Sequence, residues 1–359
     1  MKVFDYMEKY GHEQIVYFYD KTTGLKGITA IHDTTLGPAL GGTRLFNYSS
    51  EDDALFDVVR LSRGMTYKCA VGDCNCGGGK TVLLGDPKTV KTEGYLRAYG
   101  RYVQTLNGRF YTGEDMNINE KDVDYIMMET DFVNGRADMS GNPSPVTAFG
   151  VYWGIKACAK EKWGSDDLSG KVIAVQGIGA VGYALCEYLF KDGAKLIVTD
   201  INKERCDKAA SEFRAKIVSP NQIYSVQCDI FSPNSVGAIL NDETIPQLKC
   251  SIIAGAANNV LLDDQIHGDM VKDRNILYAP DFVINGGGVI NVYQEFFPPY
   301  NYERTLQVIQ KIYDRLLSIF AYAKSKNINT QLAANEYAKE RIKMIGSIRS
   351  NYIKNSKSL

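Results

Sequence analysis

Two lysines twelve residues apart are the first residues in this sequence whose types and spacing could do chemistry. Lys68 closes the segment 64–68, GMTYK, and Lys80 follows the three consecutive glycines of residues 77–79. One lysine could pair with a substrate carboxylate, whereas burial and the nearby like charge would lower the pKa of the second until it exchanges protons near neutral pH. The glycine run would let a small substrate lie against the backbone. A solvated pair of surface lysines is the alternative that these residues leave open.

An acidic loop offers the proton carrier that such a site would need. Asp115 follows the short β-rich run of residues 110–112. Its carboxylate could move protons to and from an amine. An acid that only caps a helix would give the same local pattern, so both interpretations remain open at this point.

A glycine-rich turn at residues 177–182 is a more specific motif. Its sequence, GIGAVG, follows a strand-like run and opens a helix, and Asp200 stands 18 residues after its last glycine. In the pattern G-x-G-x-x-G the first glycine makes a tight turn, the second lets the backbone approach a pyrophosphate, and the third lets helix and strand pack closely. The free N–H groups of the helix N-terminus would hold the phosphates. The turn therefore predicts a dinucleotide site, with a glycine turn that binds nothing as the alternative.

The type of dinucleotide follows from the acid after the next strand. Asp200 would accept hydrogen bonds from the ribose hydroxyls and repel a 2′-phosphate, which favours NAD over NADP. Lys203 and Arg205 stand close enough in the sequence to weaken that preference.

The elements that must position these residues change in character near residues 142–145, where two prolines interrupt the pattern. The chain before them reads as mixed α/β, with a helix opened by Ser50 and Asp53. From Lys171 onward strands alternate with helices, as in a parallel sheet whose loops gather at the carboxyl edge. The expected strands are residues 15–19, 27–32, 81–84, 172–176, 196–200, 217–218, 228–231, 251–254 and 276–278. The expected long helices are residues 146–160, 302–324 and 330–345.

Composition narrows the class of partner. At roughly 150 residues per domain, 359 residues predict about two domains, and the 41 basic and 42 acidic residues nearly cancel, which argues against nucleic acid as a partner. No stretch approaches the roughly 20 apolar residues that span a bilayer, and the N-terminus lacks the apolar run of a secretion signal. The eight cysteines form no regular framework, so we expect reduced thiols in a cytoplasmic protein and no metal site.

Six short segments, taken together, resemble the short amino-acid dehydrogenases of the Glu/Leu/Phe/Val dehydrogenase family. They follow one another in the family's order across roughly residues 10–345. The resemblance implies an α/β fold with a Rossmann-type, doubly wound NAD domain over residues 141–324. It also implies a discontinuous α/β substrate domain with a mixed sheet, formed by residues 1–140 and 325–359. The segments are residues 37–44 (GPALGGTR), 64–68 (GMTYK), 77–80 (GGGK), 142–147 (NPSPVT), 255–259 (GAANN) and 283–285 (VIN).

The resemblance further implies a reaction: reversible oxidative deamination of an L-amino acid to its 2-oxo acid and ammonia, with NAD as cofactor. Lys68 would anchor the substrate carboxylate, Lys80 would activate the attacking water, and Asp115 would carry protons to and from the amino group. The other implied substrate-binding residues are Leu40, Gly41, Gly42, Met65, Gly113, Asn259, Val289 and Val292. The implied cofactor-binding residues are Thr147, Gly177, Ile178, Gly179, Ala180, Val181, Gly182, Tyr183, Asp200, Ile201, Arg205, Ala257, Asn258 and Asn259.

The choice of amino acid rests on the residues that resemble pocket-lining ones. Gly113 is more typical of the phenylalanine enzymes, because it would leave room for a ring, whereas Val289 and residues 142–145 are more typical of leucine dehydrogenase. Substrates that differ by a methylene are separated by only about 1–3 kcal/mol. We expect leucine or another branched-chain substrate, with an aromatic amino acid as the alternative and a non-catalytic NAD-binding sensor as a remote one. The family also suggests a homo-oligomer.

Overall fold

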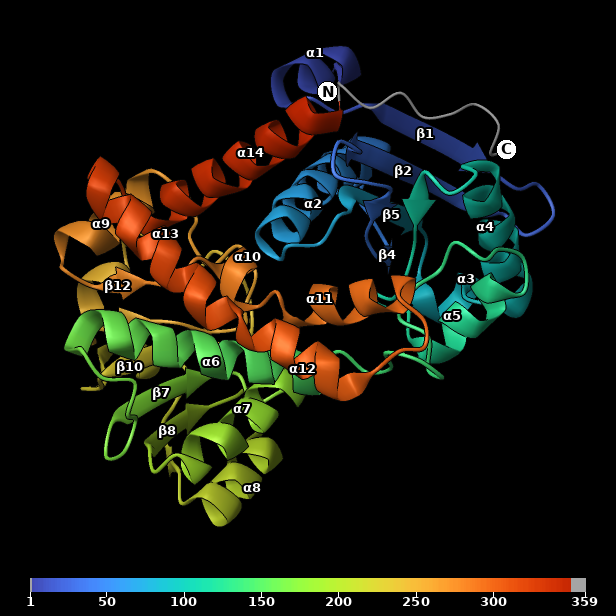
Figure 1. Cartoon of the computed structure of the whole chain (residues 1–359). Coiled ribbons are helices and arrows are strands. Elements are labelled where there is room, and N and C mark those ends of the chain that lie inside the picture. Colours follow the sequence, from blue (N-terminus) through green and yellow to red (C-terminus); the bar gives the residue numbers. More distant parts are fainter. Residues whose placement is uncertain (1, 350–359) are drawn as a thin grey trace. The chain divides into compact units, whose positions relative to one another are not determined.

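The computed structural model describes residues 2–349, which form two compact units (Figure 1). Within these residues, unit 1 comprises residues 2–142, 292–300 and 338–349, and unit 2 comprises residues 143–291 and 301–337. The chain therefore passes from one unit to the other after residues 142, 291, 300 and 337. The sequence suggested a single excursion, with domain boundaries after residues 140 and 324.

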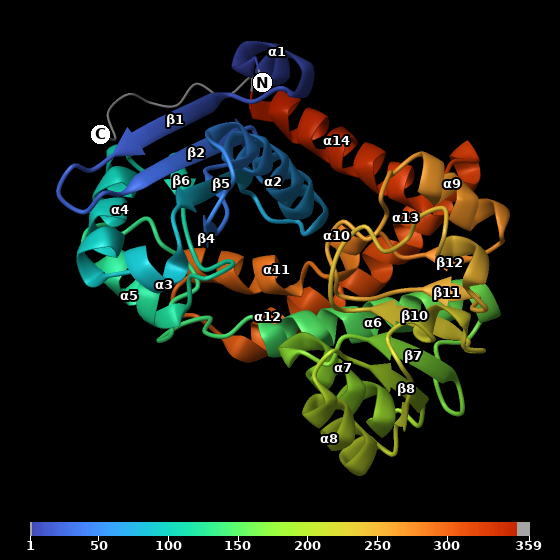
Figure 2. The same ribbon diagram turned by 180° about the vertical axis from the view of Figure 1, so that it is seen from behind.

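Unit 1 is built on a six-stranded mixed sheet with the order β1-β2-β5-β3-β6, in which β4 also pairs with β5. The β1–β2 and β2–β5 pairs are antiparallel, whereas β3 and β4 run parallel to β5, and β6 runs parallel to β3 (Figure 2). The mixed sheet that the family resemblance implied is thereby confirmed. The strands are β1 (Gln14–Tyr19), β2 (Lys26–Asp33), β3 (Ala39–Leu40), β4 (Thr43–Phe46), β5 (Gly77–Leu84) and β6 (Phe110–Tyr111).

The central strand β5 begins four residues earlier than the sequence suggested, because the glycines of residues 77–79 belong to the strand itself. A Cβ atom on Gly77 would lie 1.9 Å from the carbonyl oxygen of Asp33, and one on Gly78 would lie 2.1 Å from the backbone nitrogen of Thr66. Protein atoms thus fill the space beside these glycines. On this side the glycines let protein segments pack closely, and the expectation that a substrate lies against the run stays a prediction.

Helix α2 (Glu51–Val71) covers β5 and begins where the sequence predicted. The Ser50 hydroxyl accepts the backbone N–H of Asp53 at 3.1 Å, and three acids in the first turn complement the positive end of the helix. Its apolar face is buried against β2 and β5. The other helices of unit 1 are α1 (Val3–Tyr10), α3 (Pro87–Val90), α4 (Glu93–Thr105) and α5 (Glu120–Met127).

Unit 2 is built on a second six-stranded sheet, entirely parallel, with the order β12-β11-β10-β7-β8-β9. Counted along the chain this order is 6-5-4-1-2-3, which is the doubly wound arrangement of dinucleotide-binding domains. The strand order reverses between β7 and β10, so their following loops diverge at the carboxyl edge. The strands are β7 (Val172–Gln176), β8 (Lys195–Thr199), β9 (Lys216–Ile217), β10 (Ile230–Pro233), β11 (Ile252–Ile253) and β12 (Leu277–Tyr278).

The helices of unit 2 differ from expectation at one point. The single helix expected over residues 302–324 is divided at Lys311, whose N–H bonds to the carbonyl of Val308, three residues back instead of four. One tight turn therefore separates two helices.

The helices of unit 2 are α6 (Ser144–Trp163), α7 (Ala180–Lys191), α8 (Lys203–Phe213), α9 (Ile266–Asp273), α10 (Asp281–Ile284), α12 (Tyr302–Gln310) and α13 (Ile312–Lys326). Helices α11 (Gly287–Tyr293) and α14 (Thr330–Arg349) continue from one unit into the other, and short 3-10 turns occur at Ile223–Ser225, Ile245–Gln247 and Gln294–Phe296.

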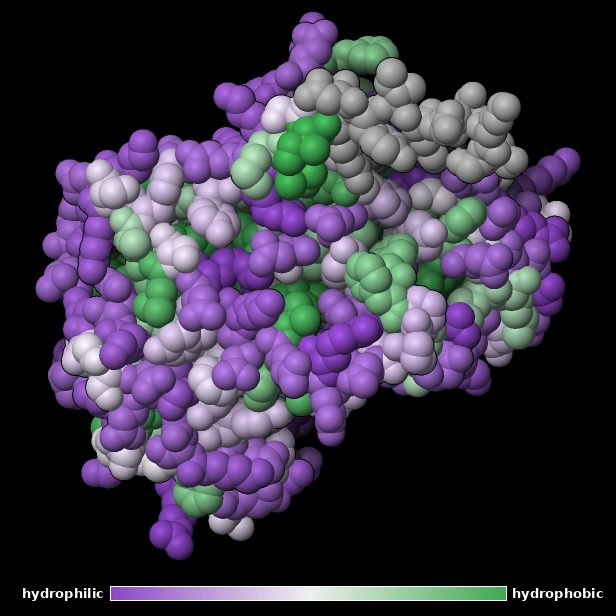
Figure 3. All heavy atoms as spheres, in the orientation of Figure 1, coloured by the Kyte–Doolittle hydropathy of each residue, from purple (hydrophilic) through white to green (hydrophobic). Residues whose placement is uncertain are grey.

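Apolar side chains of the chain are concentrated in the interior of each unit. In unit 1 they pack on both sides of the mixed sheet, and in unit 2 they pack around β10 and β11. Hydrophilic side chains predominate on the face seen in Figure 3, where hydrophobic ones occur singly or in small groups. Among residues 2–349, no helix combines the length and the hydropathy needed to cross a bilayer.

Candidate active site

Lys80 and Asp115 form an ion pair in unit 1. Lys80 lies on β5 with only 5% of its surface exposed, and its Nζ is 3.2 Å from Oδ1 of Asp115, on the loop after β6. The other carboxylate oxygen, Oδ2, accepts a hydrogen bond from Nε of Arg44 at 3.0 Å. Burial alone would raise the pKa of Asp115, but the charges of Lys80 and Arg44 outweigh it and hold that pKa well below its usual range. The pair therefore joins a buried amine to an ionised carboxylate.

Two glycines bring the neighbouring backbone segments against this pair. A Cβ atom on Gly41 would lie 1.9 Å from the carbonyl oxygen of Gly79, and one on Gly42 would lie 2.1 Å from the carbonyl oxygen of Glu114. The turn between β3 and β4 can therefore approach both β5 and the loop that carries Asp115. Only glycine permits that approach at these two positions.

Lys68 lies in the last turn of α2 and is half-buried. It stands three residues after Met65, so the two side chains share one face of the helix. The Cγ atom of Met65 is 3.4 Å from the position that a Cβ on Gly41 would take. Unit 1 thus brings together the predicted residues Gly41, Gly42, Met65, Lys80 and Asp115, with Lys68 on the face of α2 that meets this turn.

The residues predicted to line the side-chain pocket belong to both units. Leu40 is 3% exposed on β3, and Gly113 and Val292 also belong to unit 1, whereas Val289 belongs to unit 2. A Cβ atom on Gly113 would lie 2.8 Å from the carbonyl oxygen of Asn134, whose amide nitrogen donates to the carbonyl of Val292 at 3.1 Å. The expectation that Gly113 leaves room for a ring is therefore not met, because backbone occupies the space beside it.

The glycine turn of unit 2 has the geometry that the motif predicted. Gly177 has a φ of +93°, and a Cβ atom on Gly182 would lie 2.0 Å from the Gly177 carbonyl oxygen. Gly179 precedes α7, and beside it there is open space. No side chain caps this end of α7, so its first N–H groups are available to a ligand. Ala180, Val181 and Tyr183 form the first turn of α7.

Asp200 follows β8 and is tied to the glycine turn. Its Oδ2 accepts the N–H of Ile178 at 2.7 Å, and its Oδ1 accepts the N–H of Asn202 at 2.8 Å. Ile201, beside it, is 97% exposed, and Arg205 lies in the first turn of α8. The open glycine, the uncapped helix end and the fixed acid fit the pyrophosphate and ribose of NAD.

Asparagine side chains join the loop after β11 to the loop after β10 and to the end of α10. Oδ1 of Asn234 accepts the N–H of Ala256 at 2.9 Å, and the Asn285 amide donates to Oδ1 of Asn258 at 2.8 Å. Asn259 is exposed with a left-handed φ of +50°. The sequence pattern assigns no role to Asn234 or Asn285, although Asn234 lies in the loop after an expected strand and Asn285 closes the segment 283–285. They hold the backbone on which the predicted residues Ala257, Asn258 and Asn259 lie.

Thr147 and the glycines before Val289 meet inside unit 2. Thr147 lies near the start of α6, and its Oγ1 is 3.0 Å from the position that a Cβ on Gly288 would take. Any larger residue at 288 would displace this hydroxyl. The predicted residue Thr147 is therefore packed against the start of α11.

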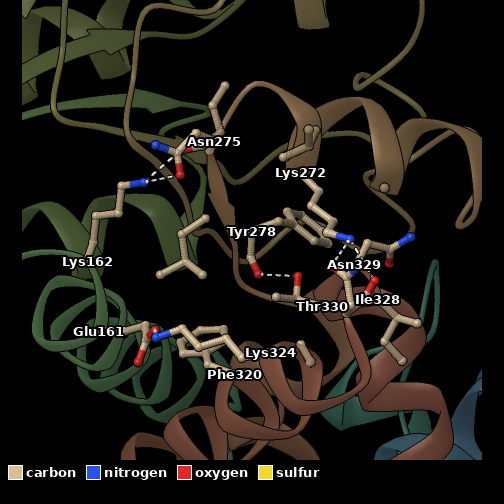
Figure 4. A pocket seen from close by; sticks show the side chains of 16 residues that line it. Glu161, Lys162, Lys272, Asn275, Tyr278, Phe320, Lys324, Ile328, Asn329 and Thr330 are labelled. Carbon is tan, nitrogen blue, oxygen red and sulfur yellow. Dashed lines mark hydrogen bonds and ion pairs between the residues drawn. The ribbon is translucent and has the colours of Figure 1, made fainter.

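A cavity elsewhere in unit 2 contains none of the predicted residues (Figure 4). It measures about 480 Å³ and is bordered by Lys162, Lys272 and Lys324. Lys162 donates to the carbonyl of Asn275 and Lys272 to that of Asn327, each at 2.7 Å, and Lys324 pairs with Glu161. Its positive charges are thus already bound to protein acceptors, which makes the cavity a poor candidate for an anion.

Comparisons with known proteins identify the family of this chain. Residues 12–132 match the family model "Glu/Leu/Phe/Val dehydrogenase, dimerisation domain", and residues 198–347 match "Glutamate/Leucine/Phenylalanine/Valine dehydrogenase". Leucine dehydrogenase of Geobacillus stearothermophilus is 55% identical over 358 residues, which cover 99% of this chain and 97% of that protein. L-tryptophan dehydrogenase of Nostoc punctiforme is 48% identical over 342 residues, or 95% of this chain and 96% of that protein.

Solved structures show the same fold. The crystal structure of L-tryptophan dehydrogenase from Nostoc punctiforme aligns with a TM-score of 0.86 and 45% identity, covering 96% of this chain and 99% of that one. The hetero-hexameric glutamate dehydrogenase from Thermus thermophilus aligns with a TM-score of 0.78 over 95% of this chain and 91% of that one, at 20% identity.

Proposed function

Because the chain belongs to the Glu/Leu/Phe/Val dehydrogenase family, we propose that it catalyses the reversible, NAD-dependent oxidative deamination of L-leucine and related branched-chain amino acids. The products are the 2-oxo acid, ammonia and NADH. The observation that carries the proposal is the buried Lys80–Asp115 pair, in a chain that is 55% identical to a leucine dehydrogenase along nearly its whole length.

In this proposal each group of unit 1 has one task. Lys68 pairs with the substrate carboxylate, helped by the backbone at Gly41 and Gly42. Asp115 takes a proton from the substrate amino group. Once the hydride has left Cα and the C–N bond has become an imine, Lys80 orients the water that adds to Cα and stabilises the oxygen of the resulting carbinolamine, from which ammonia leaves. NAD, when bound, accepts the hydride that leaves Cα. Unit 2 binds it through the free N–H groups of α7 and through Asp200.

A branched-chain substrate is favoured over an aromatic one by the surroundings of Gly113. The Asn134 carbonyl oxygen lies 2.8 Å from the position that a Cβ at 113 would take, so the missing side chain points at backbone and adds no room for a ring. The tryptophan enzyme among the relatives keeps an aromatic substrate as the second candidate.

We further propose a homo-oligomer in the cytoplasm. The first matched family model is described as a dimerisation domain, and β1 is an edge strand whose Tyr17 and Tyr19 are 54% and 56% exposed. All eight cysteines are free thiols and seven are buried, which fits a reducing compartment.

The test is NADH formation at alkaline pH from leucine, valine, isoleucine, phenylalanine and tryptophan. We expect leucine and the other branched-chain amino acids to give the highest kcat/KM. A higher kcat/KM for phenylalanine or tryptophan would change the assigned substrate from a branched-chain to an aromatic amino acid. No turnover with any of the five would refute the enzymatic function, and a non-catalytic NAD-binding sensor would then be the remaining hypothesis.

A further inference from the structure

A chain of polar side chains stands behind Asp115. Arg44, on β4, donates from Nε to Oδ2 of Asp115 at 3.0 Å and from Nη1 to Oδ2 of Asp57 at 2.9 Å. The Tyr48 hydroxyl donates to the same Asp57 oxygen at 2.6 Å. The guanidinium thus bridges two carboxylates, one of them in the proposed proton carrier.

We propose that Arg44, braced by Asp57, is a positioning residue that leaves Oδ1 as the one oxygen of Asp115 that exchanges protons with the substrate. This inference rests on the proposed function. It adds to it the atom through which the proton moves and the residue that selects that atom.

The selection follows from what each oxygen faces. Oδ2 accepts a directed hydrogen bond from a planar guanidinium that Asp57 also holds, whereas the Lys80 ammonium that faces Oδ1 is carried on a flexible stem and can turn away. Oδ1 faces Nζ of Lys80 at 3.2 Å, on the strand next to β4. When the substrate ammonium is deprotonated, its N–H bond breaks and an O–H bond forms at Oδ1. Asp115 becomes neutral while Arg44 keeps its charge.

The supporting frame consists of two paired strands and is partly shielded from water. Thr43 and Arg44 on β4 are in register with Thr81 and Val82 on β5, so both cations that hold Asp115 come from paired strands. The side chains of Arg44, Asp115 and Asp57 are only 21%, 27% and 29% exposed. Ion pairs at such depth are less screened than pairs on the surface.

Other titratable groups also act on Asp115. Glu114 precedes it, and burial together with the charges of Glu120 and Asp115 raises the pKa of Glu114 to about 7. Burial and the hydrogen bond to Asp57 raise the pKa of Tyr48, so that its hydroxyl stays protonated. Lys80 and Arg44 are the cations that face Asp115, and Asp57 shares the charge of Arg44. A pH test must therefore separate Asp115 from Glu114.

The test compares R44M, R44K and D57N, with R109M as the matched control. Arg109 is also in unit 1 and pairs with Glu13, but it is 52% exposed and lies outside this network. For each variant we would measure kcat and KM for L-leucine across pH. The same profiles in an E114Q background remove the titration of the neighbouring carboxyl.

We expect R44M to lower kcat by at least about tenfold while KM stays within about twofold. Loss of the cation raises the pKa of Asp115, so the acidic limb of the profile moves to higher pH. D57N should move it the opposite way, because the charge of Arg44 then acts on Asp115 alone. R44K should restore the position of the limb more fully than kcat, since one ammonium cannot bridge both carboxylates. R109M should match the parent enzyme.

Wild-type kcat and an unmoved limb in R44M would overturn the inference, as would a change confined to KM. R44K provides the test if R44M does not fold. The ¹³C resonance of the Asp115 carboxyl, assigned with D115N, gives a readout that needs no turnover. Its titration midpoint should be higher in R44M than in the parent protein. Equal midpoints would refute the role of Arg44 even if no amino acid were turned over, whereas an absence of turnover by itself refutes only the proposed function.

Discussion

Lys80, which is only 5% exposed, places a primary amine against a carboxylate, and its removal gives a clear prediction. Lys80→Ala should reduce kcat by about 10²–10⁴-fold, because the group that orients the attacking water is lost. NAD binding, measured by calorimetry, should be unchanged, since the residues proposed to hold NAD belong to unit 2. Lys21→Ala, at an exposed lysine of unit 1, is the control. Retained turnover would remove Lys80 from the chemistry.

A buried histidine predicts how stability depends on pH. His12 is 6% exposed, its Nε2 lies 2.8 Å from the carbonyl oxygen of Val59 on α2, and burial lowers its pKa from 6.5 to about 4. The unfolded chain therefore binds a proton that the folded one does not between those values. Stability contributed by the neutral ring is complete above about pH 6.5 and falls as the pH drops toward 4, by at most about 3 kcal/mol.

Urea denaturation at pH 7 and pH 4.5 tests this. The wild type should lose more free energy of unfolding between the two pH values than H12N does. Equal losses would show that His12 does not determine the acid sensitivity.

At the residue scale the sequence indicated the chemistry but not the partners. Lys80 and Asp115 could be selected because an amine and a carboxylate beside glycine-rich segments suit proton transfer. Arg44 lies 71 residues from Asp115 and 13 from Asp57, so no local pattern joins the three. Glu295 stands among aromatic residues in the sequence, so no local pattern indicated a role for it. In the structure it is buried and accepts backbone N–H groups from Gly135, Arg136 and Ser140. Such contacts depend on the fold of the whole unit.

At the scale of elements, alanine substitutions at two glycines distinguish the effect of close packing on stability from the effect of helix propensity. A Cβ on Gly78 of β5 would lie 2.1 Å from a backbone nitrogen of α2, whereas one on Gly64, in the exposed part of α2, has nothing within 4 Å. Gly78→Ala should cost several kcal/mol of stability, since neither backbone can give way. Gly64→Ala should add about 0.5–1 kcal/mol, because alanine favours the helix. Thermal unfolding of both variants measures these changes in stability. Similar changes in the two variants would contradict the packing argument.

Elements with strong local signals were predicted well. The Ser50 cap fixes the start of α2, and alternation of strands with helices after Lys171 gave the parallel sheet of unit 2. The glycines of residues 77–79 were expected to precede a strand over residues 81–84. Their true position depends on the close contact with α2, which only the packed structure reveals. The break between α12 and α13 at Lys311 could not be predicted, because no glycine or proline stands beside it in the sequence.

At the scale of the whole molecule, the chain builds two units from interleaved segments. The return of residues 292–300 and 338–349 to unit 1 cannot be read from periodicity, because α11 and α14 are each continuous helices that pass from one unit into the other. The prediction of a discontinuous substrate domain came from the family resemblance. The residues alone predicted only the domain boundary near residue 142.

The division into units predicts where each ligand acts. Hydrogen exchange with saturating NAD should show its strongest protection in unit 2, at residues 177–182 and 255–259, because the ligand covers the free N–H groups of α7 and the loop after β11. At 100 times its Kd, NAD should add about 2.7 kcal/mol of stability. An unreactive leucine analogue with a blocked amino group should instead protect unit 1, around β5 and residues 113–117. Gly179→Val, which places a side chain in the open space before α7, should abolish the first pattern and leave the second. If NAD protected the unit 1 segments most strongly, or if Gly179→Val left NAD protection intact, the assignment of the cofactor to unit 2 would be wrong.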